Sequence, residues 1–166
     1  MKHTILMLFS FLILFSCEKS EKIAPRIENS KIKEFQIWKT LEIKTRYQTL
    51  TIFNSADSAD YENVTYDDGI YDIPPKYDNK KVENRKIYFS ETEKDSLAKF
   101  IYSSVTTPKF TNKFVTDYVG NVKLKFSKIN MSLVCEYQSV GNWNEVSENT
   151  KKIYDIIQSK AQFSTQ

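Results

Sequence analysis

The sequence predicts an α+β domain in which an antiparallel sheet of about four to five strands carries two helices on one face, in a ββαββα-like order. Three observations predict this fold class. Residues 41–47 alternate in polarity, as a strand with one solvated face does. Residues 90–107 carry a helix cap and an apolar stripe at helical spacing. Residues 121–138 contain two further alternating segments with a short connection between them.

The first part of the sheet is expected within residues 35–53, where β-branched and aromatic residues are frequent. The residues that alternate with charged neighbours are Leu41, Ile43, Thr45 and Tyr47. The apolar frame then shifts to Leu50 and Ile52. This shift predicts either two strands or one long strand with a bulge.

The segment 54–84 has no sustained periodicity and is predicted to be an acidic loop. Its acids include Asp57, Asp60, Glu62, Asp67, Asp68, Asp72 and Asp78. Several carboxylates can form a calcium site, but their spacing departs from the known calcium-loop template, which favours a solvated loop. A second interpretation is a loop that binds a partner, because tyrosine is favoured at interfaces; the alternative is that the rings pack on their own domain. The candidate partner-binding residues are Tyr61, Tyr66, Asp67, Asp68 and Tyr71.

Residues 85–89 are predicted to form a short strand that leads directly into a helix. Ser90 and Glu93 match the S-x-x-E capping box, in which each side chain accepts a hydrogen bond from an otherwise unsatisfied backbone amide. The apolar residues that follow at helical spacing are Leu97, Phe100, Ile101 and Val105. Pro108 should end the helix because it cannot continue the hydrogen-bond ladder.

Two alternating segments follow and predict an antiparallel hairpin joined at Ser127–Asn130. Their apolar positions are Val122, Leu124 and Phe126 in one segment, and Met131, Leu133, Cys135 and Tyr137 in the other. This spacing places Cys135 on the same face as Leu133 and Tyr137. A buried, inert cysteine is therefore favoured over a reactive thiol, since the sequence places no histidine nearby to lower its pKa.

The last helix is expected from about Trp143 to Ala161, with Asn142 and Glu145 as its cap. Its buried residues should be Trp143, Val146, Ile153, Ile156 and Ile157, with Lys151, Lys152 and Lys160 on the solvated side. Residues after Gln162 are expected to fray.

The N-terminus has the layout of a secretory signal, with a basic start and an apolar run over residues 5–15. The run is shorter than the roughly 20 residues that a membrane-spanning helix needs. It ends in Leu14-Phe15-Ser16-Cys17, which resembles the lipobox of bacterial lipoproteins. That resemblance implies cleavage between Ser16 and Cys17, a diacylglycerol on the Cys17 thiol, and anchoring to the membrane by acyl chains such as palmitate.

These boundaries divide the chain into a signal peptide (1–16), a flexible tether after the lipidated cysteine (17–33) and a single α+β domain (34–162). Removing the signal leaves 150 of the 166 residues, which is enough for one domain with its own core. Glu18 rather than aspartate follows the cysteine. The lipoprotein resemblance therefore favours the outer membrane over the inner one in a Gram-negative cell.

The predicted domain also resembles small uncharacterised lipoproteins of Bacteroidota. Three segments carry this resemblance: Ser90-Glu91-Thr92-Glu93, Asp117-Tyr118-Val119-Gly120, and Cys135-Glu136-Tyr137-Gln138-Ser139-Val140 leading into Trp143. It implies a place in the cell envelope and brings no activity, cofactor or site residue.

Missing residue types exclude several chemistries. The single histidine, His3, lies in the signal, so the domain has none for catalytic triads or for metal ligation. Besides Cys17 the chain holds one cysteine, Cys135, which excludes an intramolecular disulfide in the domain. The three glycines stand apart, so there is no glycine-rich phosphate loop. A net charge of +3, which falls to +2 when Lys2 is removed, is too weak to indicate nucleic-acid binding.

The functional hypothesis is therefore a non-catalytic binding module at the cell envelope, lipid-anchored, without a cofactor or metal, and holding an envelope protein partner. An immunity protein that neutralises a toxin would be one specific form of it. The alternative is a hydrolase acting on envelope glycan through paired carboxylates, which needs no histidine. Its candidate acids are Glu136 with Asp117, or pairs among Asp67, Asp68 and Asp72. A third possibility is a purely structural lipoprotein.

Overall fold

The computed structural model describes residues 33–69, 76–108 and 115–165, with side chains for 33–66, 80–108 and 120–165. The chain divides into two units, Met1–Lys31 and Ile32–Gln166, and the described residues belong to the second. The predicted signal peptide, the lipobox with Ser16 and Cys17, and residues 17–32 of the predicted tether lie outside the described residues.

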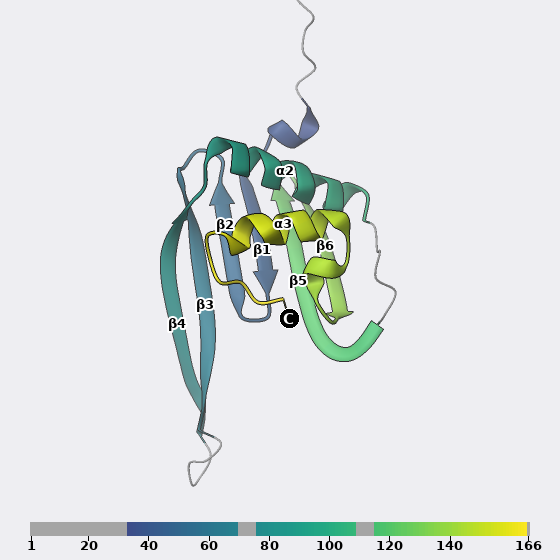
Figure 1. Ribbon diagram of the computed structural model, residues 1–166. Helices are drawn as coiled ribbons and strands as arrows, with labels where there is room; N and C mark the ends of the chain where they lie inside the picture. The colour runs from purple at the N-terminus through teal and green to yellow at the C-terminus, as the bar shows by residue number, and fades with distance from the viewer. Residues whose placement is uncertain (1–32, 70–75, 109–114, 166) are drawn as a thin grey trace, which may run out of the picture. The chain divides into compact units, whose positions relative to one another are not determined.

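Within the described residues, six strands form one antiparallel sheet (Figure 1). In chain order they are β1 (Thr40–Thr45), β2 (Gln48–Phe53), β3 (Ser58–Gly69), β4 (Lys76–Tyr88), β5 (Val115–Ser127) and β6 (Ser132–Val140). Their order across the sheet is β4-β3-β2-β1-β5-β6, so β4 and β6 are the two edges. The frame shift at Leu50 corresponds to two separate strands, because the chain turns at Arg46 and Tyr47 between β1 and β2.

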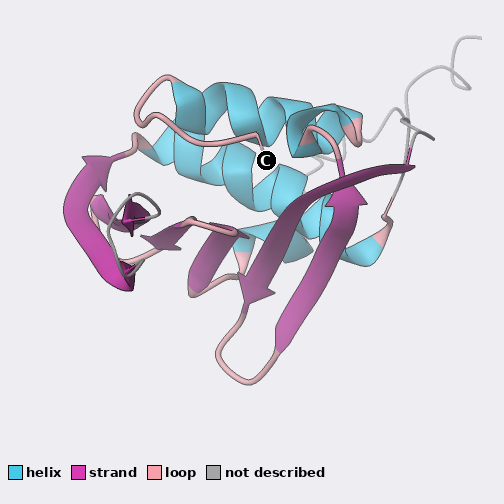
Figure 2. Cartoon of the chain, turned by 90° about the horizontal axis from the view of Figure 1, so that it is seen from below, coloured by secondary structure: helices cyan, strands magenta, loops and turns pink. Residues whose placement is uncertain are grey.

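Two helices, α2 (Glu91–Thr106) and α3 (Glu148–Gln158), cover one face of this sheet (Figure 2). Two short 3-10 segments accompany them, η1 (Glu34–Gln36) before β1 and η2 (Trp143–Glu145) before α3. The predicted α+β class with both helices on one face is confirmed. The sheet has one or two strands more than predicted.

The core lies between the sheet and the helices, because every second residue of the central strands points to the helical side. The fully buried strand residues are Leu41, Ile43, Leu50, Val122, Leu124 and Phe126. Leu97 and Ile101 of α2 and Ile153 and Ile157 of α3 complete this layer, all with no exposed surface. The apolar stripes predicted for the two helices therefore form the core face of each.

The predicted acidic loop 54–84 is wrong as secondary structure, because most of it forms β3 and β4. Alternation is present only near the base of this hairpin, where Ala59, Tyr61 and Ile87 are buried. From Val64 to Tyr66 and from Lys80 to Lys86 no described side chain is buried on either face. A ribbon that is solvated on both faces lacks the period-2 hydrophobic signal by which strands are recognised.

The capping box of α2 is confirmed. The Glu93 amide donates to Ser90 Oγ over 3.3 Å, and the Ser90 amide donates to Glu93 Oε2 over 2.7 Å. The cap expected at Asn142 is wrong, since Asn142 makes no capping hydrogen bond and only η2 follows it. The helix begins later, where Ser147 and Thr150 exchange hydrogen bonds of 3.1 and 2.9 Å between side chain and backbone.

The expected fraying after Gln162 is also wrong. Phe163 is buried, and its ring packs 5.9 Å from the ring of Tyr61 and 6.2 Å from that of Trp143. The Trp143 side chain donates to the Ser164 carbonyl over 2.7 Å, and the Trp143 amide donates to the Thr165 carbonyl over 2.9 Å. The domain therefore extends through residue 165, because aromatic burial and backbone hydrogen bonds hold this segment.

Cys135 lies on the inner face of β6, opposite Leu124 and buried, as the hairpin pattern predicted. Tyr137 is buried on the same face, and burial beside the Cys135 thiol raises the pKa of its hydroxyl far above the ordinary value. The side-chain hydroxyls of Ser104 in α2 and Ser147 at the start of α3 share this buried polar cluster.

Candidate functional site

Among the described residues, no third strand lies beside the outer half of the β3–β4 hairpin. Strand β2 pairs with β3 only from Gln48 to Thr51, opposite Asp60 to Asn63. Beyond Asn63, β3 pairs with β4 alone, from Val64 opposite Val82 to Gly69 opposite Lys76, apart from one 2.8 Å hydrogen bond from the Val64 amide to the Tyr47 carbonyl. We call residues 64–69 and 76–82 the β3–β4 extension. At about 3.3 Å per residue it is roughly 20 Å long. Figure 1 shows it projecting beyond the neighbouring strands.

Exposed apolar and aromatic side chains gather at the base of this extension. Tyr66 is 52% exposed and Val82 42% exposed, although both sit in strands. The Tyr66 ring lies edge-on to Tyr47, with 6.2 Å between the centroids. These two tyrosines border an open cavity of about 580 Å³, together with Arg46, Gln48, Asn63, Val64, Thr65 and Ser164. The result is an accessible aromatic surface next to polar side chains.

Tyr61 lies on the opposite, helix-covered face and is buried, so it packs on its own domain rather than facing a partner. Its hydroxyl donates to the Gln162 carbonyl over 3.0 Å, and the Arg85 guanidinium stacks 4.7 Å from the ring centroid. Burial raises the pKa of the Tyr61 hydroxyl, although the Arg85 charge opposes the shift. Tyr61 therefore stays neutral near pH 7 and acts as a hydrogen-bond donor that fixes the C-terminal segment.

A second groove, of about 710 Å³, lies on the helical side of the same hairpin. The strands contribute Gln48, Tyr61, Asn63, Glu83 and Arg85, whereas α3 and the C-terminal segment contribute Tyr154, Gln158 and residues 162–165. Much of its polar lining is already engaged, because Gln48 accepts from the Ser164 amide over 2.6 Å and donates to the Gln162 carbonyl over 3.3 Å. Glu83 is the one carboxylate among the described lining residues.

Of the remaining residues of the predicted partner-binding loop, Asp67 and Asp68 lie towards the outer end of the extension. Asp67 and Asp68 belong to β3, where the pairing register with β4 shifts between Asp67 and Gly69. Their side chains lie outside the described ones, and so do Tyr71 and Asp72 as whole residues. Among the described residues, no group of three or more His, Cys, Asp or Glu side chains is placed to hold a metal ion.

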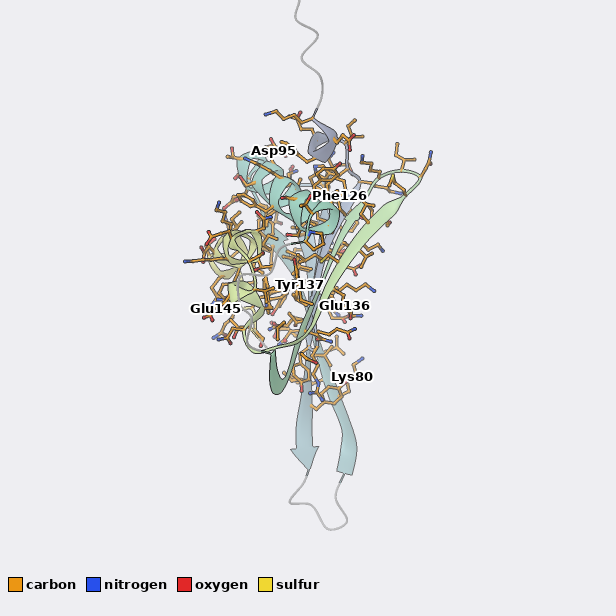
Figure 3. The ribbon with its side chains drawn as sticks, turned by 90° about the vertical axis from the view of Figure 1, so that its right-hand side faces the viewer. Lys80, Asp95, Phe126, Glu136, Tyr137 and Glu145 are labelled. Carbon is orange, nitrogen blue, oxygen red and sulfur yellow. The ribbon has the colours of Figure 1, made fainter. Side chains whose placement is uncertain are left out.

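The acids proposed for glycan hydrolysis are spread over two regions. Glu136 is exposed on the face of β6 opposite Tyr137 (Figure 3), and it pairs across the strands with Lys123. With Glu42 and Lys44 it borders a small cavity of about 260 Å³. Asp117 belongs to β5, but its side chain lies outside the described ones, as do those of Asp67 and Asp68.

The residues that sequence reasoning missed are those of the hairpin base and the C-terminal segment. Arg46 and Val82 give no local signal, whereas Tyr47, expected at an apolar position of a strand, lies in the turn between β1 and β2 and is 37% exposed. No helix in the described residues is long and apolar enough to cross a membrane. Comparisons of the chain with protein-family models, curated proteins and solved structures found no match.

Proposed function

We propose that this chain is a lipoprotein of the cell envelope, anchored through lipid on Cys17, whose folded domain is a non-catalytic module that binds an envelope protein. The lipobox-like Leu14-Phe15-Ser16-Cys17 supports the anchor. The β3–β4 extension supports the binding role, and Tyr66 and Val82 are the residues assigned to the contact.

The observation that carries this proposal is that none of the described side chains of the extension, at residues 64–66 and 80–82, is buried in the core. The buried residues of the hairpin are Ala59, Tyr61 and Ile87, all at its base. A two-stranded ribbon without a third strand or a covering helix is only marginally stable in water. A ribbon of this kind exposes about half of the Tyr66 and Val82 side chains to water, which costs free energy unless another molecule covers them.

The composition of the extension fits a protein partner. Tyrosine is enriched at protein interfaces because it offers a large rigid contact area together with a hydroxyl. Strand β4 carries more bases than acids, and Lys80 and Lys81 are exposed. Lysines on an edge strand discourage pairing with a second copy of the same edge. These features favour recognition of a different protein through side chains on the faces of the ribbon.

The test compares two matched substitutions in the full-length protein expressed in its own cells. Val82→Asp changes the extension, whereas Val134→Asp changes a valine of similar exposure, 47%, on β6. A photo-crosslinking residue at position 66 should capture one envelope protein. We expect Val82→Asp to abolish this capture and Val134→Asp to leave it unchanged.

Equal capture by both variants would show that the extension is not the contact surface. The protein-binding role would be contradicted if the protein with the photo-crosslinking residue at position 66, and with valine kept at positions 82 and 134, captured nothing while position 66 was accessible to a water-soluble label. Circular dichroism of both variants serves as the folding control.

A further inference from the structure

A second exposed surface lies at the end of the sheet opposite the β3–β4 extension. There η1 enters β1, and the turn between β5 and β6 closes through a 2.8 Å hydrogen bond from the Lys128 amide to the Met131 carbonyl. The two meet because the Lys39 amide donates to the Ser127 carbonyl over 2.7 Å. Strand β3 starts at this end and runs away from it, so the extension points in the opposite direction (Figure 1).

Three large apolar side chains are exposed at this end. Ile129 is 86% exposed, more than any other large apolar residue among the described side chains, and Ile37 and Met131 are 50% and 49% exposed. The hydrogen bond between Lys39 and Ser127 brings the two segments together. Ile37 lies two residues before Lys39, and Ile129 lies two residues after Ser127, so both are near this hydrogen bond in the chain. Single exposed apolar residues are ordinary, but several together mark a contact surface. We call Ile37, Ile129 and Met131 the end patch.

Lysines flank the residues of the end patch along the chain. Lys33 and Lys39 are exposed, and Lys128 lies 5.6 Å above the ring of Tyr102. The acid within this group is Glu34, which accepts a hydrogen bond from the Tyr102 hydroxyl and lies 3.9 Å from the Lys128 ammonium. Glu34 is exposed, but its carboxylate is paired with Tyr102 and Lys128, and the exposed Lys33 and Lys39 can face an external anion. Exposed apolar side chains with lysines near them are typical of protein surfaces that bind anionic membranes.

The position of the end patch in the chain indicates which surface it contacts. The domain begins at Lys33, sixteen residues after Cys17, and such a segment spans at most about 55 Å even when fully extended. If Cys17 carries lipid, this end of the domain is confined close to the bilayer at high effective concentration. We infer that the end patch docks on the bilayer that holds the Cys17 lipid, with Ile129 and Met131 in the headgroup region and Lys33 and Lys39 against anionic phospholipid. This inference rests on the proposed anchor.

Docking in this orientation has a direct consequence for the binding role. Because the extension leaves the sheet from the other end, it points away from the bilayer when the end patch faces it. The docked domain would present Tyr66 and Val82 to a partner at a fixed distance from the membrane, rather than tumbling on its tether.

The test uses the mature lipidated protein, purified from membranes and reconstituted into vesicles of phosphatidylcholine and phosphatidylglycerol with brominated acyl chains. Ile129→Trp places a fluorescent reporter in the patch, and Tyr66→Trp places one in the extension as the matched control. Trp38 and Trp143 are buried and give the same background in both variants. We expect bromine to quench the fluorescence of the Ile129→Trp variant and to leave that of the Tyr66→Trp variant unchanged.

The charge contribution is tested in the same vesicles. Lys33→Glu with Lys39→Glu should weaken the quenching at position 129, whereas Lys151→Glu with Lys152→Glu, which changes two exposed lysines on α3, should not. Replacing phosphatidylglycerol by phosphatidylcholine should have the same effect as the first pair.

Three outcomes would overturn the inference. Absence of quenching at position 129 in protein that mass spectrometry shows to be acylated removes the docking and leaves the anchor intact. Absence of an acyl group on Cys17 removes the anchor and the docking together. Crosslinking of position 129 to a protein in native membranes, without quenching in vesicles, assigns the end patch to a protein contact instead.

Discussion

Lys94 illustrates how single polar residues tie this fold together. Its side chain is 2% exposed, the one charged side chain that is buried among the described residues. From α2 its ammonium donates to the carbonyls of Asn54 and Ala56, over 3.4 and 3.3 Å, and lies 2.5 Å from Glu91 Oε1. Lys94 thereby fixes the turn from β2 into β3 against the first turn of α2. The hairpin that carries the extension starts from this contact.

Replacing Lys94 should weaken the fold more than replacing its acidic partner. Lys94→Met keeps the apolar stem but leaves two carbonyls without their donor, and we expect a loss of about 2 kcal/mol in the free energy of unfolding. Glu91→Gln should cost less than about 1 kcal/mol, because that side chain is exposed and screened by water. Urea denaturation of both variants measures the difference. Equal losses would show that the ion pair, rather than the carbonyl contacts, provides the stability.

At the scale of the element, Glu93 links the start of α2 to the segment after α3. It accepts from the Ser90 amide and lies 3.0 Å from the Lys160 ammonium. Burial alone would raise the pKa of Glu93, but the hydrogen bonds from Ser90 and the Lys160 charge outweigh it and lower the pKa below the ordinary value of 4.5. A lowered pKa in the folded state means that the ionised carboxylate stabilises the fold.

The pH dependence follows from this direction. The contribution of Glu93 is fully present above pH 4.5, the ordinary value, and is lost as the pH falls through the lower pKa of the folded state. We expect the unsubstituted protein to unfold at higher urea than Glu93→Gln at neutral pH, and the two midpoints to converge in strong acid. Asp95→Asn, at an exposed acid of α2, serves as the control substitution. A gap between the midpoints that persists unchanged in acid would rule out ionisation as its cause.

The C-terminal segment is a structural element, although it has no regular secondary structure. Phe163 is 3% exposed and inserts between Tyr61 of β3 and Trp143 of η2. Phe163→Ala should therefore lower the free energy of unfolding by about 3 kcal/mol or more, as expected for removal of a buried aromatic ring. Thr165→Ala, which keeps the backbone hydrogen bond to Trp143, is the matched control. A loss below about 1 kcal/mol for Phe163→Ala would mean that the segment frays in solution.

The sequence predicted the elements whose signals lie within one short segment, and it missed those that depend on residues far apart in the chain or lack such a signal. The Ser90–Glu93 box and the stripe through Leu97 and Ile101 lie within one helix, and that helix was predicted correctly. The C-terminal segment was missed because its partner Gln48 lies 116 residues away from Ser164. The β3–β4 extension was missed because solvated faces carry no hydrophobic period. In the candidate site, Tyr66 was predicted and is exposed, whereas Tyr61 was placed with it and is buried instead.

At the scale of the whole molecule, the sheet separates two surfaces: the end patch, to which we assign membrane docking, and the β3–β4 extension, to which we assign protein binding. The end patch leaves one end of the strands and the extension leaves the other. Among the described side chains, the core between them is built mainly by β1, β2, β5, β6 and the two helices, and the hairpin side contributes Ala59, Tyr61, Ile87 and Phe89. A substitution in either surface can therefore change binding without disturbing the core.

The anchor should be equally separable from the fold, because residues 32–166 form a compact unit distinct from residues 1–31. Cys17→Ser removes the thiol that would carry the lipid, so we expect mass spectrometry to find neither acylation nor cleavage before residue 17. The urea midpoint of the domain should stay the same, since Cys17 belongs to the other unit of the chain. Ser16→Ala, which keeps a small residue before the cysteine, should be acylated and cut normally. If Cys17→Ser were still cut before residue 17 and held in the membrane fraction, the lipobox interpretation would be wrong, and the end patch would lose its reason to face the bilayer.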